Sequence, residues 1–347
     1  MVKGLFDWVG LCIVAAGCTQ RCRHCSASAS EAEPELLTLD QTEAVVNALR
    51  QENEKTPPLY EHVSPGLLYE PMDHPDIVEI QRLFYELEPE AALVRTMATN
   101  GHRIATSANW RELVAGLQRW GVERFQLTLH GLEEQHDWFT RRRGSYGEVM
   151  EAVRRLAAAS ARVLWVYFLD RLNVAELPQA MRAVREAARG TDVEESINVW
   201  GPAGRAAQAE DLLPRALDLE LLPEDIRRME MLSQYLPERE WVRLARLGEM
   251  QQMHDDFMAE VRQKGGARPY NLRVDRGNVE RIAELLAEAR QQGLNRGRKQ
   301  EPQTVDLARL AASYGNEQGN GLYRVSTMRH EWQRREREQG NSPSGRS

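Results

Sequence analysis

Three of the four cysteines lie close together near the start of the chain. Cys18, Cys22 and Cys25 form a C-x3-C-x2-C pattern. The run from Gly10 to Gly17 before them is apolar or small, which predicts a buried strand, so the cysteines follow its carboxyl end. Cysteine thiolates hold iron–sulfur clusters, and a [4Fe–4S] cluster has four irons. Three thiolates would therefore leave one iron open to a substrate or cofactor.

A structural zinc site is the alternative use of these cysteines. A closed zinc site needs four Cys or His ligands, usually in paired C-x2-C units. No cysteine follows Cys25, so a second pair is missing, although His24 could supply a fourth ligand. A non-catalytic iron–sulfur or zinc protein that binds a partner therefore stays open.

The cysteine stretch resembles the signature of the radical S-adenosylmethionine (SAM) superfamily, C-x3-C-x-aromatic-C, with His24 in the aromatic position. The resemblance implies that Cys18, Cys22 and Cys25 ligate a [4Fe–4S] cluster and that SAM binds its open iron beside His24. It also implies that SAM is cleaved reductively to a 5′-deoxyadenosyl radical, which abstracts hydrogen from a substrate. Such an enzyme would need a reducing partner such as flavodoxin or ferredoxin.

Glu70 and Pro71 follow a short apolar strand predicted at residues 66–69. They resemble the G-G-E-P-type segment of the superfamily, although Leu68 and Tyr69 replace the glycine pair. The resemblance implies that Glu70 and the neighbouring backbone hold the SAM amino group. An isolated Glu-Pro pair, in contrast, often only marks a turn.

Asn100 ends a strand predicted at residues 91–97, in the segment Thr99-Asn100-Gly101. Superfamily members end their third strand in a similar way, which makes Asn100 a candidate SAM contact. Asn-Gly is also a turn sequence where positive φ is needed, and this reading stays open for Asn100.

The strand predicted at residues 125–131 and the loop after it resemble the superfamily's fourth strand. The resemblance implies that Thr128 and His130 contact the SAM ribose. It also implies that Arg143 pairs with the SAM carboxylate, which a guanidinium can grip through two hydrogen bonds. A histidine at a strand end can equally be structural, and the adjacent arginines at 141 and 142 are alternatives to Arg143.

Asn198 and Trp200 lie in the last strand predicted before residue 205, at residues 196–200. Superfamily members bind adenine near the end of this strand, so both residues are candidate cofactor contacts. A tryptophan packed in the core is the alternative for Trp200.

Strands and helices alternate along the first 200 residues, which predicts a parallel sheet built by right-handed crossovers. Polar residues at the carboxyl ends of the strands place the site on one face. The resemblance implies an α/β fold, an incomplete (β/α)6 parallel barrel (a partial TIM barrel) with a mainly helical C-terminal extension. The six predicted strands end near residues 17, 69, 97, 131, 169 and 200, and the helices between them lie near 39–52, 77–84, 110–120, 149–156 and 177–184.

Two regions are expected, a radical SAM partial barrel at residues 1–205 and a helical region at 206–347 with a disordered end. The absence of cysteines after Cys25 excludes the cysteine-rich extension of many peptide- and natural-product-modifying relatives. The helical region is expected to cover the barrel mouth and form part of the substrate pocket. A separate interaction module is the alternative, because ten Lys or Arg against six Asp or Glu occur from Arg296 onward.

The composition and net charge of −7 are those of a soluble globular protein. No apolar run is long enough for a membrane helix, and no secretory signal is expected. Four cysteines, three of them clustered, fit a reducing cytoplasmic compartment rather than a disulfide framework. The acidic balance argues against a nucleic-acid partner.

The substrate is expected to be a small molecule of natural-product biosynthesis or a ribosomal peptide. Dehydrogenation, rearrangement, epimerisation and bond formation all stay open after hydrogen abstraction, and no catalytic residue is assigned. An epimerase generally needs a hydrogen donor, often a thiol. Cys12 is the one cysteine outside the motif, and we expect it to be packed in the core.

Overall fold

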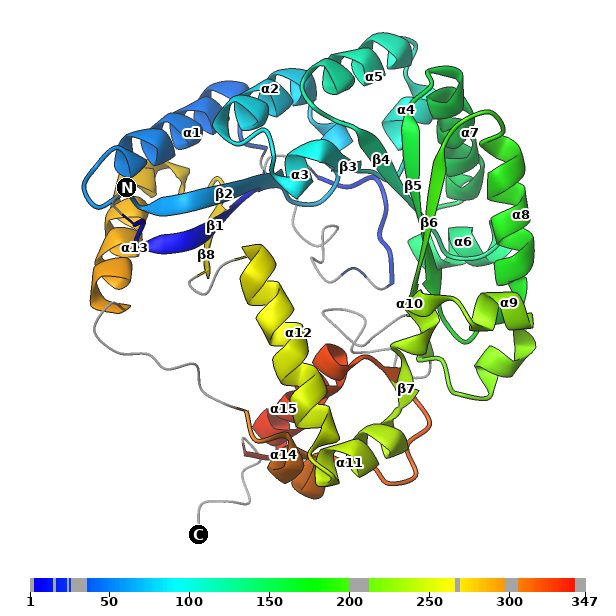
Figure 1. Ribbon diagram of the computed structural model, residues 1–347. Coiled ribbons are helices and arrows are strands. Elements are labelled where there is room, and N and C mark those ends of the chain that lie inside the picture. Colours follow the sequence, from blue (N-terminus) through cyan, green and yellow to red (C-terminus); the bar gives the residue numbers. More distant parts are fainter. Residues whose placement is uncertain are drawn as a thin grey trace.

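A computed structural model describes residues 3–14, 17–23, 25, 36–199, 212–265, 269–296 and 305–340. Its strands follow an open arc with helices on the outer side, and a smaller helical lobe lies across the opening (Figure 1). Two parallel sheets form the arc, one ordered β2-β1-β8 and one ordered β3-β4-β5-β6. The fold class is therefore the predicted α/β partial barrel. Among the described residues, no helix is both long enough and apolar enough to cross a membrane.

The first sheet consists of β1 (Phe6–Ile13), β2 (Tyr60–Leu67) and β8 (Pro269–Val274), with β1 in the centre. Leu11 and Ile13 of β1 are fully buried and share a core with Leu272 and Val274 of β8. Because side chains alternate along a strand, Cys12 and its register partner Arg273 face the other way, into the barrel. The outer side of this sheet is covered by α1 (Leu39–Asn53), α2 (Ile77–Leu87) and α13 (Ile282–Arg296).

The second sheet consists of β3 (Thr96–Ala98), β4 (Arg124–Leu129), β5 (Arg162–Leu169) and β6 (Val193–Val199). Alternate residues of β4, such as Leu127 and Leu129, are buried in the core under the outer helices. Thr128 lies between them on the inner side, beside Val166 of β5 in the register. The helices of this half are α4 (His102–Thr106), α5 (Trp110–Arg119), α6 (Glu133–Thr140), α7 (Ser145–Ala158) and α8 (Leu177–Ala187).

Three predicted strands are placed differently in the structure. The strand predicted at 10–17 begins earlier, at Phe6, and its last residue is Ile13. The strand predicted at 91–97 is the short helix α3 (Ala92–Arg95) followed by β3, because Ala92 and Leu93 favour a helix and only Val94 of this turn is fully buried. The strand predicted at 66–69 begins earlier, at Tyr60, where exposed Glu61 and His62 interrupt the apolar run.

The strand β8 and helix α13 lie in the region for which the sequence predicts a mainly helical extension. They return to the barrel, where β8 pairs with the free edge of β1 (Figure 1). A repeated sequence accompanies them: Val274-Asp275-Arg276-Gly277-Asn278-Val279 matches Leu169-Asp170-Arg171-Leu172-Asn173-Val174 after β5. Each copy leads through a single 3-10 turn, Val174–Glu176 or Val279–Arg281, into the following helix.

The remaining elements form the lobe, with a core of its own around Trp241, Met250 and Trp332. Phe139 of α6 belongs to the same core, and Phe168 of β5 packs against it, so the lobe contacts the barrel at the carboxyl end of β5. The lobe contains α11 (Glu238–Arg246), α12 (Glu249–Gly265), α14 (Leu307–Tyr314), α15 (Val325–Gly340), and the strands β7 (Leu236–Pro237) and β9 (Leu322–Tyr323). The short elements between β6 and β7 are Asp218–Leu221, α9 (Glu224–Arg227) and α10 (Glu230–Ser233).

Candidate functional site

The cysteine loop is fixed by backbone hydrogen bonds to the end of α6. The Arg21 amide donates to the Thr140 carbonyl (3.0 Å) and the Arg23 amide to the Phe139 carbonyl (2.9 Å). The Arg23 guanidinium also lies 3.9 Å from the centre of the Trp138 ring, a cation–π distance. The loop after β1 is therefore held over the barrel by an element that follows β4.

The three thiols of the loop are half-buried neighbours. Cys22 Sγ donates to Gln20 Oε1 (3.3 Å), and the Gln20 amide donates to Cys18 Sγ (3.4 Å). Burial raises the pKa of the Cys18 thiol to about 11, and burial together with nearby Cys18 and Cys25 raises the pKa of the Cys22 thiol further. A shared cationic centre would reverse this effect, since metal-bound thiols are deprotonated.

The chemistry of this donor set fits an iron–sulfur cluster, because clusters take thiolates and leave room for inorganic sulfide between the ligands. In the described part of the chain, no three His, Cys, Asp or Glu side chains are grouped closely enough to hold a single metal ion. His24, the residue in the aromatic position of the motif, lies outside the described residues.

Glu70 is buried beside this loop, with 3% of its surface exposed. Its amide donates to the Gly17 carbonyl (3.0 Å), which joins the end of β2 to the loop. Its carboxylate accepts hydrogen bonds from Thr99 Oγ1 and the Asn100 amide, both at 2.6 Å, and from the Met72 amide at 3.3 Å. These three donors fix the orientation of the carboxylate.

Burial raises the pKa of Glu70 to about 8, although its hydrogen-bond donors act in the opposite direction. Nearby Asp73 adds to the increase. A carboxylate that is buried without a cation is costly, so a cationic group that reached Glu70 would stabilise its charged form. Pro71, the next residue, is buried at the start of the 3-10 turn Pro71–Asp73.

The Asn100 side chain links the end of β3 to the cysteine loop. Its Nδ2 donates to Thr19 Oγ1 (2.9 Å) and lies 3.8 Å from Cys18 Sγ. Gly101 after it has a φ of +81°, so the Asn-Gly pair also forms the turn that its sequence indicates. The structure therefore brings together Cys18, Glu70 and Asn100 from the ends of three successive strands.

Thr128 and His130 differ in their surroundings although both lie at the end of β4. Thr128 is partly exposed on the inner face. The His130 ring is 2% exposed and stacks on Phe139 with 4.3 Å between ring centres, which gives it a packing role. Asn198 is the partly exposed register partner of Phe168 on β6, and Trp200 lies outside the described residues.

Arg143 is exposed in the turn between α6 and α7. Among the described residues, no hydrogen bond or ion pair joins it to the cysteine loop or to Glu70. Its neighbour Arg142 is engaged elsewhere, since it donates to Glu148 Oε1 (2.7 Å) and to His102 Nδ1 (3.0 Å). Arg141 is also exposed; burial of Arg23 in the cysteine loop lowers the pKa of Arg23, and the charge of Arg141 lowers it further. Arg141 and Arg143 are therefore both accessible to a ligand.

The surroundings of Glu70 add one residue that was missed from the sequence, Thr99, and a backbone feature of Tyr69. Thr99 holds the Glu70 carboxylate, and its signal was the polar segment Thr99-Asn100-Gly101 at a strand end. Tyr69 has a φ of +71°, the left-handed region that glycine favours. The turn before Glu70 therefore keeps a glycine-like backbone although the glycine pair is replaced.

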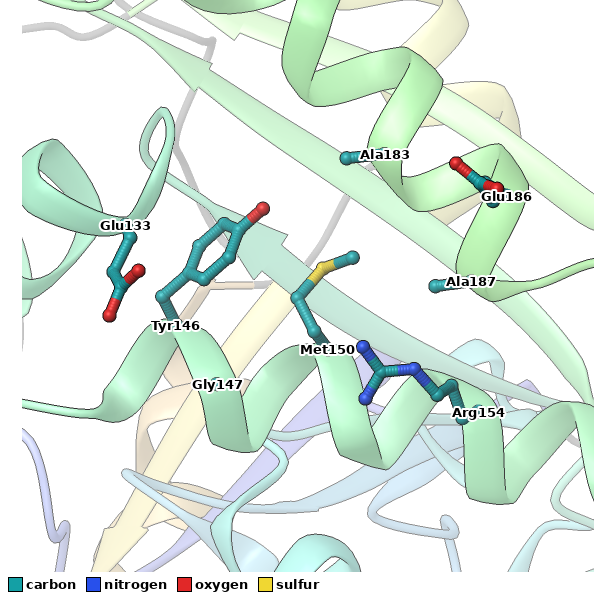
Figure 2. A pocket seen from close by; sticks show the side chains of 8 residues that line it. All are labelled: Glu133, Tyr146, Gly147, Met150, Arg154, Ala183, Glu186 and Ala187. Carbon is teal, nitrogen blue, oxygen red and sulfur yellow. The ribbon is translucent and has the colours of Figure 1, made fainter.

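A surface pocket also lies between α7 and α8, outside the barrel (Figure 2). Tyr146, Met150 and Ala183 form its apolar part, and Arg154 and Glu186 are charged groups at its side. None of the sequence-predicted site residues lines it, so it is separate from the strand ends described above.

Comparison with known proteins identifies the barrel. Residues 12–184 match the family described as the radical SAM superfamily. No curated protein matches the chain.

Several solved structures resemble the chain at low sequence identity. Streptococcus suis SuiB bound to S-adenosylmethionine has 12% identity and a TM-score of 0.42, over 79% of this chain and 51% of SuiB. Native anSMEcpe with bound AdoMet has 13% identity and a TM-score of 0.39, over 76% of this chain and 64% of that protein. HydG, a maturase of the [FeFe]-hydrogenase, has 16% identity and a TM-score of 0.42, over 67% of this chain and 51% of HydG. The matched region thus spans about half of SuiB and of HydG.

Proposed function

Because this chain belongs to the radical SAM superfamily through its domain at residues 12–184, we propose that it is an enzyme that binds a [4Fe–4S] cluster and SAM. When bound, this pair supplies reductive cleavage of SAM to a 5′-deoxyadenosyl radical that abstracts hydrogen from a substrate. The observation that carries the proposal is the buried Glu70 carboxylate, which Thr99 and Asn100 hold beside the cysteine loop.

In this proposal the chain's own residues divide into two groups. Cys18, Cys22 and Cys25 hold three irons and leave the fourth open. Glu70 accepts hydrogen bonds from the SAM ammonium. The hydrogen bond from Asn100 to Thr19 holds the cysteine loop beside Glu70. Burial disfavours the charged form of the Glu70 carboxylate, and the SAM ammonium would stabilise that form. This complementarity supports the assignment.

The other proposed SAM contacts rest on the position of each residue in the motif pattern. Thr128 and Asn198 face the barrel interior and are partly exposed, so both can reach a ligand directly. His130 would act through its packing against Phe139 rather than through an exposed ring. The remaining proposed contacts are His24, Pro71, Arg143 and Trp200.

The proposed substrate is a small molecule of natural-product biosynthesis or a peptide, and the reaction after hydrogen abstraction stays open. The lobe is proposed to cover the substrate, which the packing of Phe139 and Phe168 against the lobe core supports. Flavodoxin or ferredoxin in a reducing, cytoplasmic compartment would supply the electron.

The competing function is that of a non-catalytic metal protein that binds a partner. Iron and sulfide analysis after anaerobic reconstitution separates the two. We expect about four irons and four sulfides per chain, and nearly none when Cys18, Cys22 and Cys25 are replaced together by alanine. One zinc and no sulfide in the wild-type protein would contradict the proposal.

A further inference from the structure

The inner face of β8 carries polar side chains directly beside β1. Asn271 and Arg273 alternate with the buried Leu272 and Val274, so both point into the barrel, and both are exposed there. Asn271 lies over Gly10, where its Oδ1 occupies the space that a Cβ atom would need. This wall of the barrel is therefore polar, although the strand belongs to the C-terminal third of the chain.

The Arg273 guanidinium lies at the same end of the barrel as the cysteine loop. Its Nη2 is 3.4 Å from the hydroxyl of Tyr69, the residue directly before Glu70. It faces the Cys12 thiol on β1. Burial raises the pKa of this thiol, and the positive charge of Arg273 acts in the opposite direction. Its side chain nevertheless keeps 59% of its surface exposed, so the cation is available to a ligand in the barrel.

The repeated turn shows that the fold does not need a cation at this position. In both copies the Asn side chain accepts from the Asp amide, at 2.8 Å for Asn173 and 2.9 Å for Asn278. The same side chain donates to a backbone carbonyl at the end of the strand, that of Phe168 (2.6 Å) or Arg273 (3.1 Å). The first copy thus builds the same turn with an apolar residue, Phe168, where the second copy has arginine.

Arg273 is also not needed to neutralise the aspartate of its own turn. Asp170 in the first copy is fully buried, and its Oδ1 accepts hydrogen bonds from the amides of Leu172 (2.7 Å) and Asn173 (3.0 Å). Asp275 likewise accepts from the Gly277 amide (3.0 Å), and its contact with Arg273 is long, at 3.8 Å.

We infer that Arg273 binds a carboxylate of the substrate, so that the substrate is an acid or a peptide with an acidic side chain. The inference rests on the proposed function, because it assigns the interior of the barrel to substrate. A guanidinium holds a carboxylate through two parallel hydrogen bonds, and its exposure beside Tyr69 leaves the donors accessible.

Binding of four probes to the reconstituted full chain tests this assignment, with and without SAM. The acidic probes are glutarate and N-acetyl-glycyl-glutamyl-glycinamide. The neutral probes are glutaramide and the corresponding glutamine peptide. Ligand-observed NMR titration gives each dissociation constant. We expect at least one acidic probe to bind about tenfold more tightly than its neutral partner, and to lose about tenfold in affinity in Arg273→Gln.

Two further variants control the experiment. Arg281 belongs to the same strand–helix unit, but its guanidinium is paired with Glu284 on the outer helix. Arg281→Gln should therefore leave the affinity for the acidic probes unchanged. Arg273→Lys keeps the positive charge but cannot form two parallel hydrogen bonds, so it should lose less affinity than Arg273→Gln. The comparison of Arg273→Lys with the wild type remains informative if the glutamine variant fails to fold. Binding of glutarate alone supports a small acid, and binding of the acidic tripeptide supports a peptide.

Equal affinity of Arg273→Gln and wild type for the acidic probes would overturn the inference, as would failure of both acidic probes to bind the wild type. A loss of SAM affinity alone in Arg273→Gln would assign the arginine to the cofactor and also overturn it. Cleavage of SAM by the wild type is measured separately. If SAM is not cleaved but probe binding depends on Arg273, the proposed function fails and the carboxylate site stands.

Discussion

At the scale of single residues, the site depends on the Glu70 carboxylate, which is buried even without a bound cation. Glu70 has three hydrogen-bond donors and still has a raised pKa, because burial outweighs them. The Glu-Pro sequence after a strand predicted the place of Glu70. Thr99 stands in a polar segment at a strand end, but no local pattern shows that its hydroxyl contacts a residue 29 positions away.

Replacing Glu70 by alanine should weaken SAM binding and leave iron and sulfide content unchanged. The lost hydrogen bond involves charged partners, so we expect a cost of about 1.5–3 kcal/mol in binding free energy. Equilibrium dialysis with labelled SAM measures it, and Glu79→Ala, at an exposed position of α2, is the matched control. An unchanged SAM affinity in Glu70→Ala would remove this residue from the cofactor site.

The raised pKa of Glu70 also predicts how stability without SAM depends on pH. The folded protein binds the Glu70 proton more tightly than the unfolded chain does, so this contribution to stability is complete below the ordinary carboxyl pKa. It is lost as pH rises through about 8. Urea unfolding at several pH values should show that the difference in the free energy of unfolding between wild type and Glu70→Gln falls as pH rises. A difference that stays constant across this range would contradict the assignment of a raised pKa.

At the scale of elements, the strand–turn–helix unit after residue 268 shows what the sequence could and could not predict. The six earlier strands follow from apolar runs and from their alternation with helices. β8 was missed although Leu272 and Val274 alternate with Asn271 and Arg273, which is the pattern of a half-buried strand. The repeat Asp-Arg-x-Asn-Val was a second signal, because the Asn side chain builds the same turn in both copies.

Replacing the turn asparagine by alanine should destabilise each unit, because backbone groups at the strand end lose their partners. We expect a decrease of about 1–3 kcal/mol in the free energy of unfolding for Asn173→Ala and Asn278→Ala. The larger decrease should occur at Asn173, which is 4% exposed. Urea unfolding measures both variants against Asn295→Ala, an exposed position near the end of α13. Equal stability of all three would show that the repeated turn is not needed for the fold.

At the scale of the whole molecule, the chain leaves the barrel after β6 and returns to its first strand. The lobe is built from α11 and α12 before this return and from α14 and α15 after it, and it contacts the barrel through Phe139 and Phe168. Sequence predicted the helices of this region from their leucines. It could not predict that β8 pairs with β1, because the partner strand lies at the opposite end of the chain.

Phe139 joins the lobe core to the end of β4, so its replacement should loosen the lobe against the barrel. Phe139→Ala removes a fully buried ring, and we expect a loss of about 3–5 kcal/mol in stability. Hydrogen exchange should increase in α14 and α15 as well as in α6. Faster exchange confined to α6 would show that the lobe does not depend on this contact.

The central claim is that the cysteine loop and Glu70 together support the cleavage of SAM. The most direct measurement is the amount of 5′-deoxyadenosine formed when the anaerobically reconstituted full chain is reduced in the presence of SAM. The wild type should form it, Glu70→Ala should form less at limiting SAM, and the variant with alanine at Cys18, Cys22 and Cys25 should form none. A wild-type protein that carries its cluster and binds SAM, but forms no 5′-deoxyadenosine under reduction, would contradict the account.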